Sequence, residues 1–313
     1  MNIVFFGSSD FGLPALKALS DAGYAVSCVV TQPDKKKGRG LALGGTAVKE
    51  FCLTSGLRVF QPQNVNAPET TAFLKELHAD LFIVIAYGQI FSQGVLCLPR
   101  NPSLNIHASL LPKYRGAAPI NWALIKGEKT TGISVMEMAV RMDAGPVYLQ
   151  KETDILPDET ATGLKERLAE LAAAGLLEAL NKIEKGVLRP AAQDDTKVSF
   201  APRLKKEDGL IDWNDPAKEI YDLIRGCLDW PGAFTYYQGR LLKVYGAGLE
   251  EDGTLPKGKP GEIVQVHKNG IVVSCGKGFL IIKELQLEGK RRMKIEEFIA
   301  GHRISAGEIL GAR

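Results

Sequence analysis

The chain has 313 residues, of which 45% are hydrophobic and 24% charged, and its formal net charge is +3. This composition is ordinary for a globular protein, and the length is sufficient for two domains with their own cores. A net charge so close to neutral argues against nucleic-acid binding through the overall field, so any such role must come from local basic clusters.

The cysteines and the apolar runs indicate the cellular compartment in which the protein is expected. The five cysteines are scattered and include no CxxC pair, which predicts no disulfide framework, no zinc site and a reducing, cytoplasmic location. The opening MNIVFFG has no basic stretch before its apolar run, so it is expected to be a strand and not a signal peptide. No uncharged apolar run approaches the length of a membrane-spanning helix.

The first half of the chain alternates short apolar runs with segments of helical spacing. Strands are predicted at residues 2–6, 25–31, 81–86, 104–108, 132–138 and 147–153. Helices are predicted at residues 13–22, 47–55, 68–78, 119–126 and 162–184, and a polar, glycine-rich loop at 34–46. This alternation predicts an α/β domain at 1–188, with a Rossmann-like, mostly parallel sheet and helices on both faces.

The pattern changes after Gly186. Residues 189–208 are polar, contain two prolines and lack periodicity, which is typical of a linker. Beyond them follow a predicted helix at 216–226, a short helix at 295–300 and five strand-like runs separated by glycine turns, at 233–237, 241–245, 261–266, 270–275 and 278–284. Five short strands of this kind predict a second domain at 209–313, a small β-barrel of the oligonucleotide-binding (OB) type.

The segment SLNIHASLLPKYRGAAPINWAL places two polar residues, Asn105 and His107, in one predicted strand. Residues i and i+2 of a strand point to the same side, so the two share a face, while Ile106 takes the other. Ligands of open α/β sheets bind beyond the carboxyl ends of strands. An amide donor beside an imidazole suits acyl-type transfer, in which negative charge develops on an oxygen. The alternative is that the two side chains merely satisfy each other in a core.

A third polar group is needed to orient or charge the imidazole, and Asp143 in RMDAGPV is the best candidate. It follows the predicted strand 132–138, and a loop at a strand end is where a carboxylate could meet His107. An ordinary turn-forming Asp before Ala-Gly is the competing interpretation. GSSDFG at residues 7–12 lacks the Lys and Ser/Thr of a phosphate loop and the full GxGxxG, and no cluster has metal-ligand spacing, so neither a nucleoside triphosphate nor a metal is expected.

Three basic clusters are candidates for contact with a polyanion. They are Lys35, Lys36, Lys37 and Arg39; Arg203, Lys205 and Lys206; and Lys290, Arg291, Arg292 and Lys294. Any one of them alone is most often a solvated face. Together they favour a polyanionic partner that binds in a salt-dependent way.

These motifs resemble those of a known family. NIHASLLPKYRGAAPINWAL together with MDAGPV resembles the folate-dependent formyltransferases. TQPDKKKGRG, FAPRLKKEDGLIDW, PGAFTYYQGRLLKVYGA and EEFIAGHRISAGEIL resemble the branch of that family that acts on methionyl-tRNA, so the resemblance covers essentially the whole chain. It implies transfer of a formyl group from the co-substrate 10-formyltetrahydrofolate to the α-amine of initiator methionyl-tRNA, for translation initiation and without a metal. A monomer is expected, because no strand or helix is left conspicuously apolar.

The resemblance also implies roles for individual residues. Asn105, His107 and Asp143 become the catalytic set. The folate co-substrate is assigned two segments: Ser109, Leu110, Leu111 and Pro112, and the pterin-pocket loop Ala86, Tyr87, Gly88 and Gln89. The tRNA is assigned five residues: Arg39, Lys205, Lys206, Lys290 and Arg291. The family often carries further lysines after the Gly-Arg-Gly of the first loop, where this chain has Leu41-Ala42-Leu43-Gly44-Gly45.

Three alternatives share parts of this pattern. Formyltransferases that act on an amino-sugar nucleotide share SLLPKYRG and the pair Asn121-Trp122, but the C-terminal half here resembles the tRNA branch. Glycinamide ribonucleotide formyltransferases normally stop after one domain. A non-catalytic RNA-binding protein built on a retired enzyme domain is disfavoured by the intact Asn105, His107 and Asp143.

Overall fold

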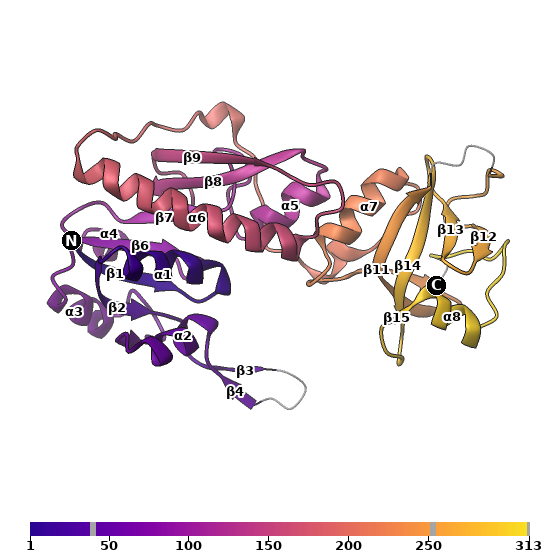
Figure 1. The fold of residues 1–313 in the computed structure, drawn as a ribbon, viewed down its shortest axis with the longest axis horizontal. Coiled ribbons are helices and arrows are strands. Elements are labelled where there is room, and N and C mark those ends of the chain that lie inside the picture. Colours follow the sequence, from indigo (N-terminus) through magenta and orange to yellow (C-terminus); the bar gives the residue numbers. More distant parts are fainter. Residues whose placement is uncertain (38–41, 251–254, 312–313) are drawn as a thin grey trace. The chain divides into compact units, whose positions relative to one another are not determined.

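The computed structural model describes residues 1–37, 42–250 and 255–311, and the chain forms two compact units (Figure 1). Unit 1 consists of Met1–Pro119, Thr130–Asp154 and Lys165–Ala201. Unit 2 consists of Ile120–Lys129, Ile155–Leu164 and Pro202–Arg313. Within the described ranges, no helix is both long enough and apolar enough to cross a membrane.

Unit 1 is built on one seven-stranded sheet with the order β5-β2-β1-β6-β7-β8-β9. In chain order its strands are β1 (Asn2–Gly7), β2 (Ala25–Val30), β5 (Val59–Phe60), β6 (Leu81–Ile85), β7 (Leu104–His107), β8 (Thr130–Glu137) and β9 (Val147–Asp154). The strands from β5 to β7 are parallel, whereas β8 and β9 are antiparallel to their neighbours. The predicted Rossmann-like, mostly parallel sheet is confirmed, with an antiparallel edge that the alternation of elements did not indicate.

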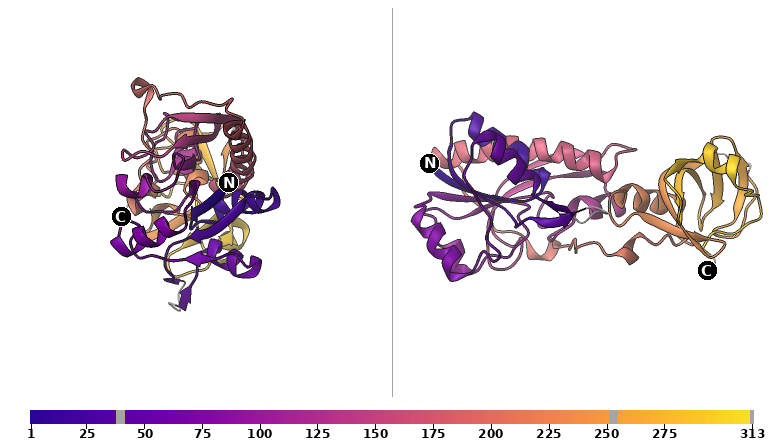
Figure 2. Two further views of the ribbon diagram at one scale, coloured as in Figure 1. Left: turned by 90° about the vertical axis from the view of Figure 1, so that its left-hand side faces the viewer. Right: turned by 90° about the horizontal axis from the view of Figure 1, so that it is seen from below.

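Helices cover both faces of this sheet (Figure 2). They are α1 (Leu13–Asp21), α2 (Ala47–Ser55), α3 (Pro68–Glu76), α4 (Gln93–Leu96) and α6 (Ala161–Glu184). Because side chains alternate along a strand, Phe6 and Val84 pack on one face in a cluster with Leu74 of α3 and Val95 of α4. On the other face, helix α6 approaches β8 so closely that a Cβ at Gly175 would lie 2.7 Å from Ile133 Cδ1.

The predicted loop at 34–46 contains a short antiparallel hairpin, which corrects that expectation. Strand β3 (Lys35–Lys37) pairs with β4 (Ala42–Gly44). The lysine- and glycine-rich sequence has no apolar alternation, so the pairing depends on backbone hydrogen bonds that leave no pattern in the side chains. Helix α2 begins where it was predicted, because Thr46 caps it by accepting a hydrogen bond from Lys49 N at 3.0 Å.

Unit 2 is a curled antiparallel sheet with the order β10-β11-β14-β13-β12. Its strands are β10 (Ala233–Tyr237), β11 (Arg240–Glu250), β12 (Ile263–His267), β13 (Gly270–Ser274) and β14 (Phe279–Leu287), and the short β15 (Met293–Lys294) pairs with β14. Its helices are α5 (Pro119–Ile125), α7 (Ala217–Gly226) and α8 (Ile295–Gly301). The last described residues connect the two edge strands: Gly311 N donates to Tyr236 O of β10, and Ile263 N of β12 donates to Glu308 O, both at 2.8 Å. This closure confirms the predicted barrel-like domain.

We predict that Gly132→Ala destabilises unit 1 by about 3 kcal/mol, because a Cβ at this position would lie 2.0 Å from the backbone oxygen of Lys151 on the paired strand β9. Chemical denaturation followed by circular dichroism measures the loss. Gly94→Ala in α4 of unit 1 is the matched control, since its Cβ would meet only an ordinary contact of 3.8 Å, with Ser92 Oγ. The control should be unchanged or more stable by up to about 1 kcal/mol.

A second prediction concerns acid. Glu178 of α6 lies between Lys151 Nζ at 2.5 Å and Lys182 Nζ at 2.7 Å, and these hydrogen bonds lower the pKa of its carboxyl to about 2. A depressed pKa means that the stabilising contribution is present above the ordinary Glu pKa of about 4.3 and is lost as the pH falls towards 2. We expect Glu178→Gln to weaken the pH dependence of the urea midpoint in that window, whereas Glu170→Gln, which changes an exposed glutamate of the same helix, should not.

Candidate active site

The structure places Asn105 and His107 on one face of β7. Asn105 lies between Val84 of β6 and Met136 of β8, and His107 lies opposite Ser134 of β8. His107 is buried, whereas Asn105 is half-buried. Within residues 1–37, 42–250 and 255–311, the side-chain amide of Asn105 has no hydrogen-bond partner. The two groups therefore do not satisfy each other, and the amide is free to donate to a bound molecule.

Both ring nitrogens of His107 face acceptor oxygens. Its Nε2 lies 2.8 Å from Tyr114 O, and because a carbonyl only accepts, Nε2 carries a hydrogen. Its Nδ1 lies 3.6 Å from Asp143 Oδ2, within reach of an ion pair but longer than a hydrogen bond. The doubly protonated imidazolium would thus have an acceptor at each nitrogen. Burial of both side chains strengthens this electrostatic interaction, because little water screens it.

Asp143 follows β8, as predicted, and reaches His107 through a connection that runs back across the sheet. Strand β8 runs antiparallel to β7, so Glu137 at its end lies opposite Leu104, at the start of β7. The connection from β8 to β9 must therefore travel back over three residues of β7, roughly 10 Å at about 3.3 Å per residue, to bring Asp143 beside His107. Asp143 adopts φ +50° in this turn, and its Oδ2 accepts a hydrogen bond from Gly116 N at 2.8 Å.

The turn from Ser109 to Pro112 is held by a residue that sequence analysis missed. The buried hydroxyl of Ser134 donates to Ser109 O at 2.7 Å and accepts from Leu111 N at 3.0 Å and from Gln150 Nε2 at 2.9 Å. Gln150 Nε2 also donates to Leu111 O at 2.8 Å. Ser134 and Gln150 thus fix the backbone directly after His107. A polar residue, Ser134, within the apolar run GISVM is the feature of the sequence that could have indicated this role.

The loop Ala86 to Gln89 begins level with His107. Val84 pairs with Asn105, so the residues two positions further on, Ala86 and His107, are at the same height along parallel strands. Ala86 and Gly88 are exposed and adopt φ +48° and +90°.

Two side chains of the same loop point elsewhere. The Tyr87 ring packs among Phe6 and Phe91, and burial raises the pKa of its hydroxyl, which has no partner in the described part of the chain. The Gln89 amide is occupied by Val65 N at 2.7 Å and Gln63 O at 3.1 Å. The backbone of the loop is also held: Ala86 O accepts from Ser8 N at 3.2 Å, and Tyr87 O accepts from Ser8 Oγ at 3.1 Å and from Gln32 Nε2 at 3.3 Å. The loop is therefore ordered by contacts with the segments that follow β1 and β2.

The residues predicted to contact tRNA have different positions. Arg39 lies outside the described residues. Lys205 and Lys206 are exposed at the start of the short helix Lys206–Gly209 in unit 2. Lys290 and Arg291 are exposed after β14, and Arg291 forms an ion pair with Glu297. The four described residues therefore present their charges at the surface of unit 2.

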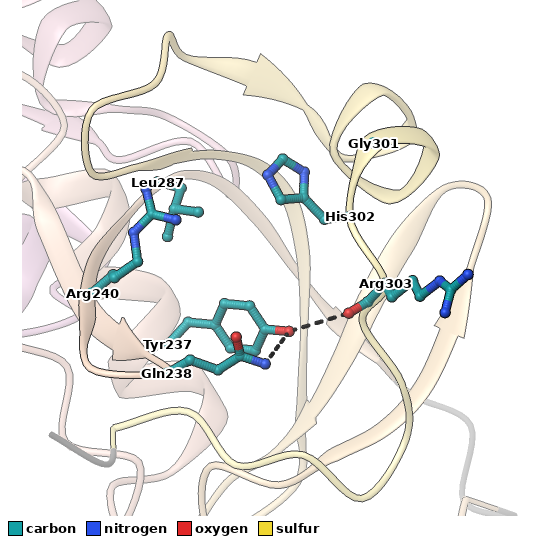
Figure 3. A pocket seen from close by; sticks show the side chains of 7 residues that line it. All are labelled: Tyr237, Gln238, Arg240, Leu287, Gly301, His302 and Arg303. Carbon is teal, nitrogen blue, oxygen red and sulfur yellow. Dashed lines mark hydrogen bonds between the residues drawn. The ribbon is translucent and has the colours of Figure 1, made fainter.

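Unit 2 also contains a hollow of about 280 Å³ beside the β10–β11 hairpin (Figure 3). It is lined by Tyr237, Gln238, Arg240, Leu287, Gly301, His302 and Arg303. His302 Nδ1 donates to Phe298 O at 3.1 Å, and in the described residues no carboxylate forms an ion pair with this ring. The hollow lacks the carboxylate–imidazole pair of unit 1, so the catalytic candidate remains the Asn105 face of the sheet. The described residues contain no group of three or more His, Cys, Asp or Glu that could hold a metal ion.

Comparison with known proteins supports the predicted resemblance. One family model, described as formyl transferase, matches residues 1–180, and another, described as formyl transferase, C-terminal domain, matches residues 203–303. The chain is 47% identical over 311 residues to the methionyl-tRNA formyltransferase of Geobacter metallireducens, with 99% of both chains covered. It is 45% identical over 313 residues to that of Acetivibrio thermocellus, with 99% of this chain and 100% of the relative covered.

A solved structure shows the same fold. HypX from Aquifex aeolicus, in complex with tetrahydrofolic acid, matches with a TM-score of 0.65 at 20% identity, over 96% of this chain and 47% of HypX. This chain therefore spans about half the length of HypX, and at that identity the likeness concerns the fold alone. With both family models matched in order and close relatives aligned end to end, the chain belongs to the formyl transferase family.

Proposed function

We propose that the protein transfers the formyl group of 10-formyltetrahydrofolate to the α-amine of initiator methionyl-tRNA, the step that prepares this tRNA for translation initiation. The observation that carries the proposal is the free amide of Asn105 beside the His107–Asp143 pair on one face of β7. Full-length similarity to methionyl-tRNA formyltransferases supports the choice of acceptor.

The geometry supports direct transfer. The α-amine attacks the formyl carbon, a C–N bond forms, and the formyl oxygen gains negative charge. The Asn105 amide donates a hydrogen bond to this oxygen, and the positive charge of the His107 imidazolium stabilises it. The carboxylate of Asp143 takes up the proton that the amine loses. The bond between the formyl carbon and N10 of the folate then breaks, N10 gains a proton, and tetrahydrofolate leaves.

The folate co-substrate is assigned to the two segments that border this face. Residues 109–112 and 86–89 both follow a strand of the parallel part of the sheet, at the same height. Ser134 and Gln150 hold the first segment, so the pterin would meet a backbone already ordered before binding.

The tRNA is assigned to exposed basic residues, Lys205, Lys206, Lys290 and Arg291, together with Arg39. We place the reaction in the cytoplasm and expect a monomer. The five free cysteines support a reducing compartment, and burial raises the pKa of Cys28 and Cys52 to about 11.

We expect His107→Ala to lower the rate of formyl transfer by about 10²–10³, the typical effect of removing one stabilising group from an oxyanion site, and Asn105→Ala to act similarly. The assay is formylation of Met-tRNA by purified protein with 10-formyltetrahydrofolate, under single-turnover conditions. His267→Ala, which changes a histidine of β12 in unit 2, is the matched control and should retain full activity. Near-normal turnover by folded His107→Ala would contradict the mechanism, and formylation of an amino-sugar nucleotide in place of Met-tRNA would contradict the acceptor.

The assignment of the tRNA makes a prediction about salt. Each phosphate contact removed should reduce the slope of log affinity against log salt concentration by about 0.7–0.9, so the triple variant Lys205→Ala, Lys206→Ala, Lys290→Ala should bind tRNA more weakly and with a shallower slope. Its rate at saturating tRNA should stay near that of the parent protein. Lys17→Ala, an exposed lysine paired with Asp21 in unit 1, is the control. An unchanged salt slope in the triple variant would exclude these lysines as phosphate contacts.

A further inference from the structure

A buried arginine lies behind the Asp143 turn. Arg115 is 2% exposed, and its Nε and Nη2 donate to Gln193 Oε1 at 3.1 and 2.8 Å. Its Nη2 also donates to Asp195 Oδ1 at 2.9 Å, and this guanidinium holds the pKa of the Asp195 carboxyl below its ordinary value. Its Nη1 has no partner in the described part of the chain. A buried guanidinium with an unpartnered donor costs stability, so folding alone does not explain Arg115.

Gln193 connects this arginine to the catalytic turn. Its Nε2 donates to Asp143 O at 2.9 Å and to Gly145 O at 2.7 Å, while its Oε1 accepts from Arg115. The reverse orientation of the amide would set its NH₂ against the guanidinium and its oxygen against two carbonyls. Only one orientation of Gln193 therefore satisfies both sides.

The backbone around Arg115 holds the same turn from a second direction. Gly116 N donates to Asp143 Oδ2 at 2.8 Å. Arg115 N donates to Ser199 O at 2.9 Å, and Ala201 N donates to Arg115 O at 2.8 Å. The strand-like pairing with residues 199–201 thus fixes the peptide that binds the catalytic carboxylate.

A third attachment involves the other end of the turn. Arg141 Nη1 donates to Asp195 Oδ2 at 3.2 Å, so Asp195 joins Arg141 to Arg115. The turn needs such restraints, because it runs back across the sheet and holds Asp143 at φ +50°, which a non-glycine residue rarely adopts.

We propose that Arg115 and Gln193 are positioning residues for formyl transfer, which hold the Asp143 turn so that the carboxylate faces His107 Nδ1. The inference rests on the proposed function, in which Asp143 and His107 act together. Gln193 touches neither reacting group and acts through the backbone of Asp143.

The test is Gln193→Leu, which removes one of the two side-chain acceptors of Arg115 and both hydrogen bonds to the turn. We expect kcat to fall by about 10- to 100-fold, in line with the cost of misplacing a catalytic group by about 1 Å, while KM for either substrate changes little. Gln61→Leu is the matched control, because Gln61 also donates two hydrogen bonds of 2.8 Å within unit 1, to Gln32 O and Asp34 Oδ1, away from the turn. The control should keep the kcat of the parent protein.

A double-mutant cycle separates positioning from general destabilisation. If Gln193 acts through Asp143, adding Gln193→Leu to Asp143→Ala should lower kcat no further, within about 2-fold, because coupled residues are not additive. Independent effects would multiply, and that result would overturn the proposal. Should Gln193→Leu fold poorly, Gln193→Glu gives the same test, since its carboxylate still pairs with Arg115 but cannot donate to Asp143 O.

A spectroscopic readout does not depend on activity. The protein has four histidines, so the ring signals of His107 can be assigned by NMR. We expect Gln193→Leu to shift these signals in the same direction as Asp143→Asn, and Gln61→Leu to leave them unchanged. Unshifted signals in Gln193→Leu, or a parent-like kcat in that variant, would overturn the positioning role. Absence of formyl transfer in the parent protein would instead refute the proposed function, and the NMR comparison would still decide whether Gln193 positions Asp143.

Discussion

The approach of the Asp143 carboxylate to the His107 ring is the interaction on which the candidate site depends. His107 lies at the end of β7, whereas Asp143 follows the end of β8, which lies beside the start of β7. No regular element therefore brings the two side chains together. The β8–β9 connection must fold back over the sheet, against the local preference of Asp143 for negative φ. The polar contacts around the β8–β9 connection hold it in this folded-back path.

Those contacts place buried polar groups in a region where packing alone would favour apolar ones. Ser134 is fully buried and has three hydrogen-bond partners. Arg115 is almost fully buried. Low surrounding polarity makes each satisfied hydrogen bond more rigid and each broken one more costly. The face of β7 that carries Asn105 is therefore preorganised. The free amide of Asn105 is the group that would donate a hydrogen bond to a substrate. On the opposite face of the sheet, the side chain of Ile133 is buried under α6.

The features of the fold and site that could be predicted from the sequence are those that depend on residues close together in the chain. The shared face of Asn105 and His107 follows from the two-residue period of a strand, and the structure has it. Asp143 was expected in the loop after the strand 132–138, and it lies there, but the pattern of elements did not show that β8 is antiparallel and that the loop must fold back to His107. Gln193 carried no signal, because it lies in a polar segment without periodicity, and its partners Arg115 and Asp143 are 78 and 50 residues away. The sequence also did not show that the ring of Tyr87 packs against Phe6 and Phe91, because those contacts join residues that are not neighbours in one regular element.

The same geometry indicates where acceptor choice must originate. An amide, an imidazole and a carboxylate stabilise the oxyanion and accept a proton from any primary amine, and none of them reads a methionyl group or a nucleotide. Binding energy that distinguishes one acceptor from another must therefore come from residues away from the reacting atoms. Under the proposed function this task falls to exposed basic residues, four of which lie on the surface of unit 2, whereas the reacting groups lie in unit 1. Under the proposed function, acceptor affinity and chemical rate would therefore depend on separate groups of residues.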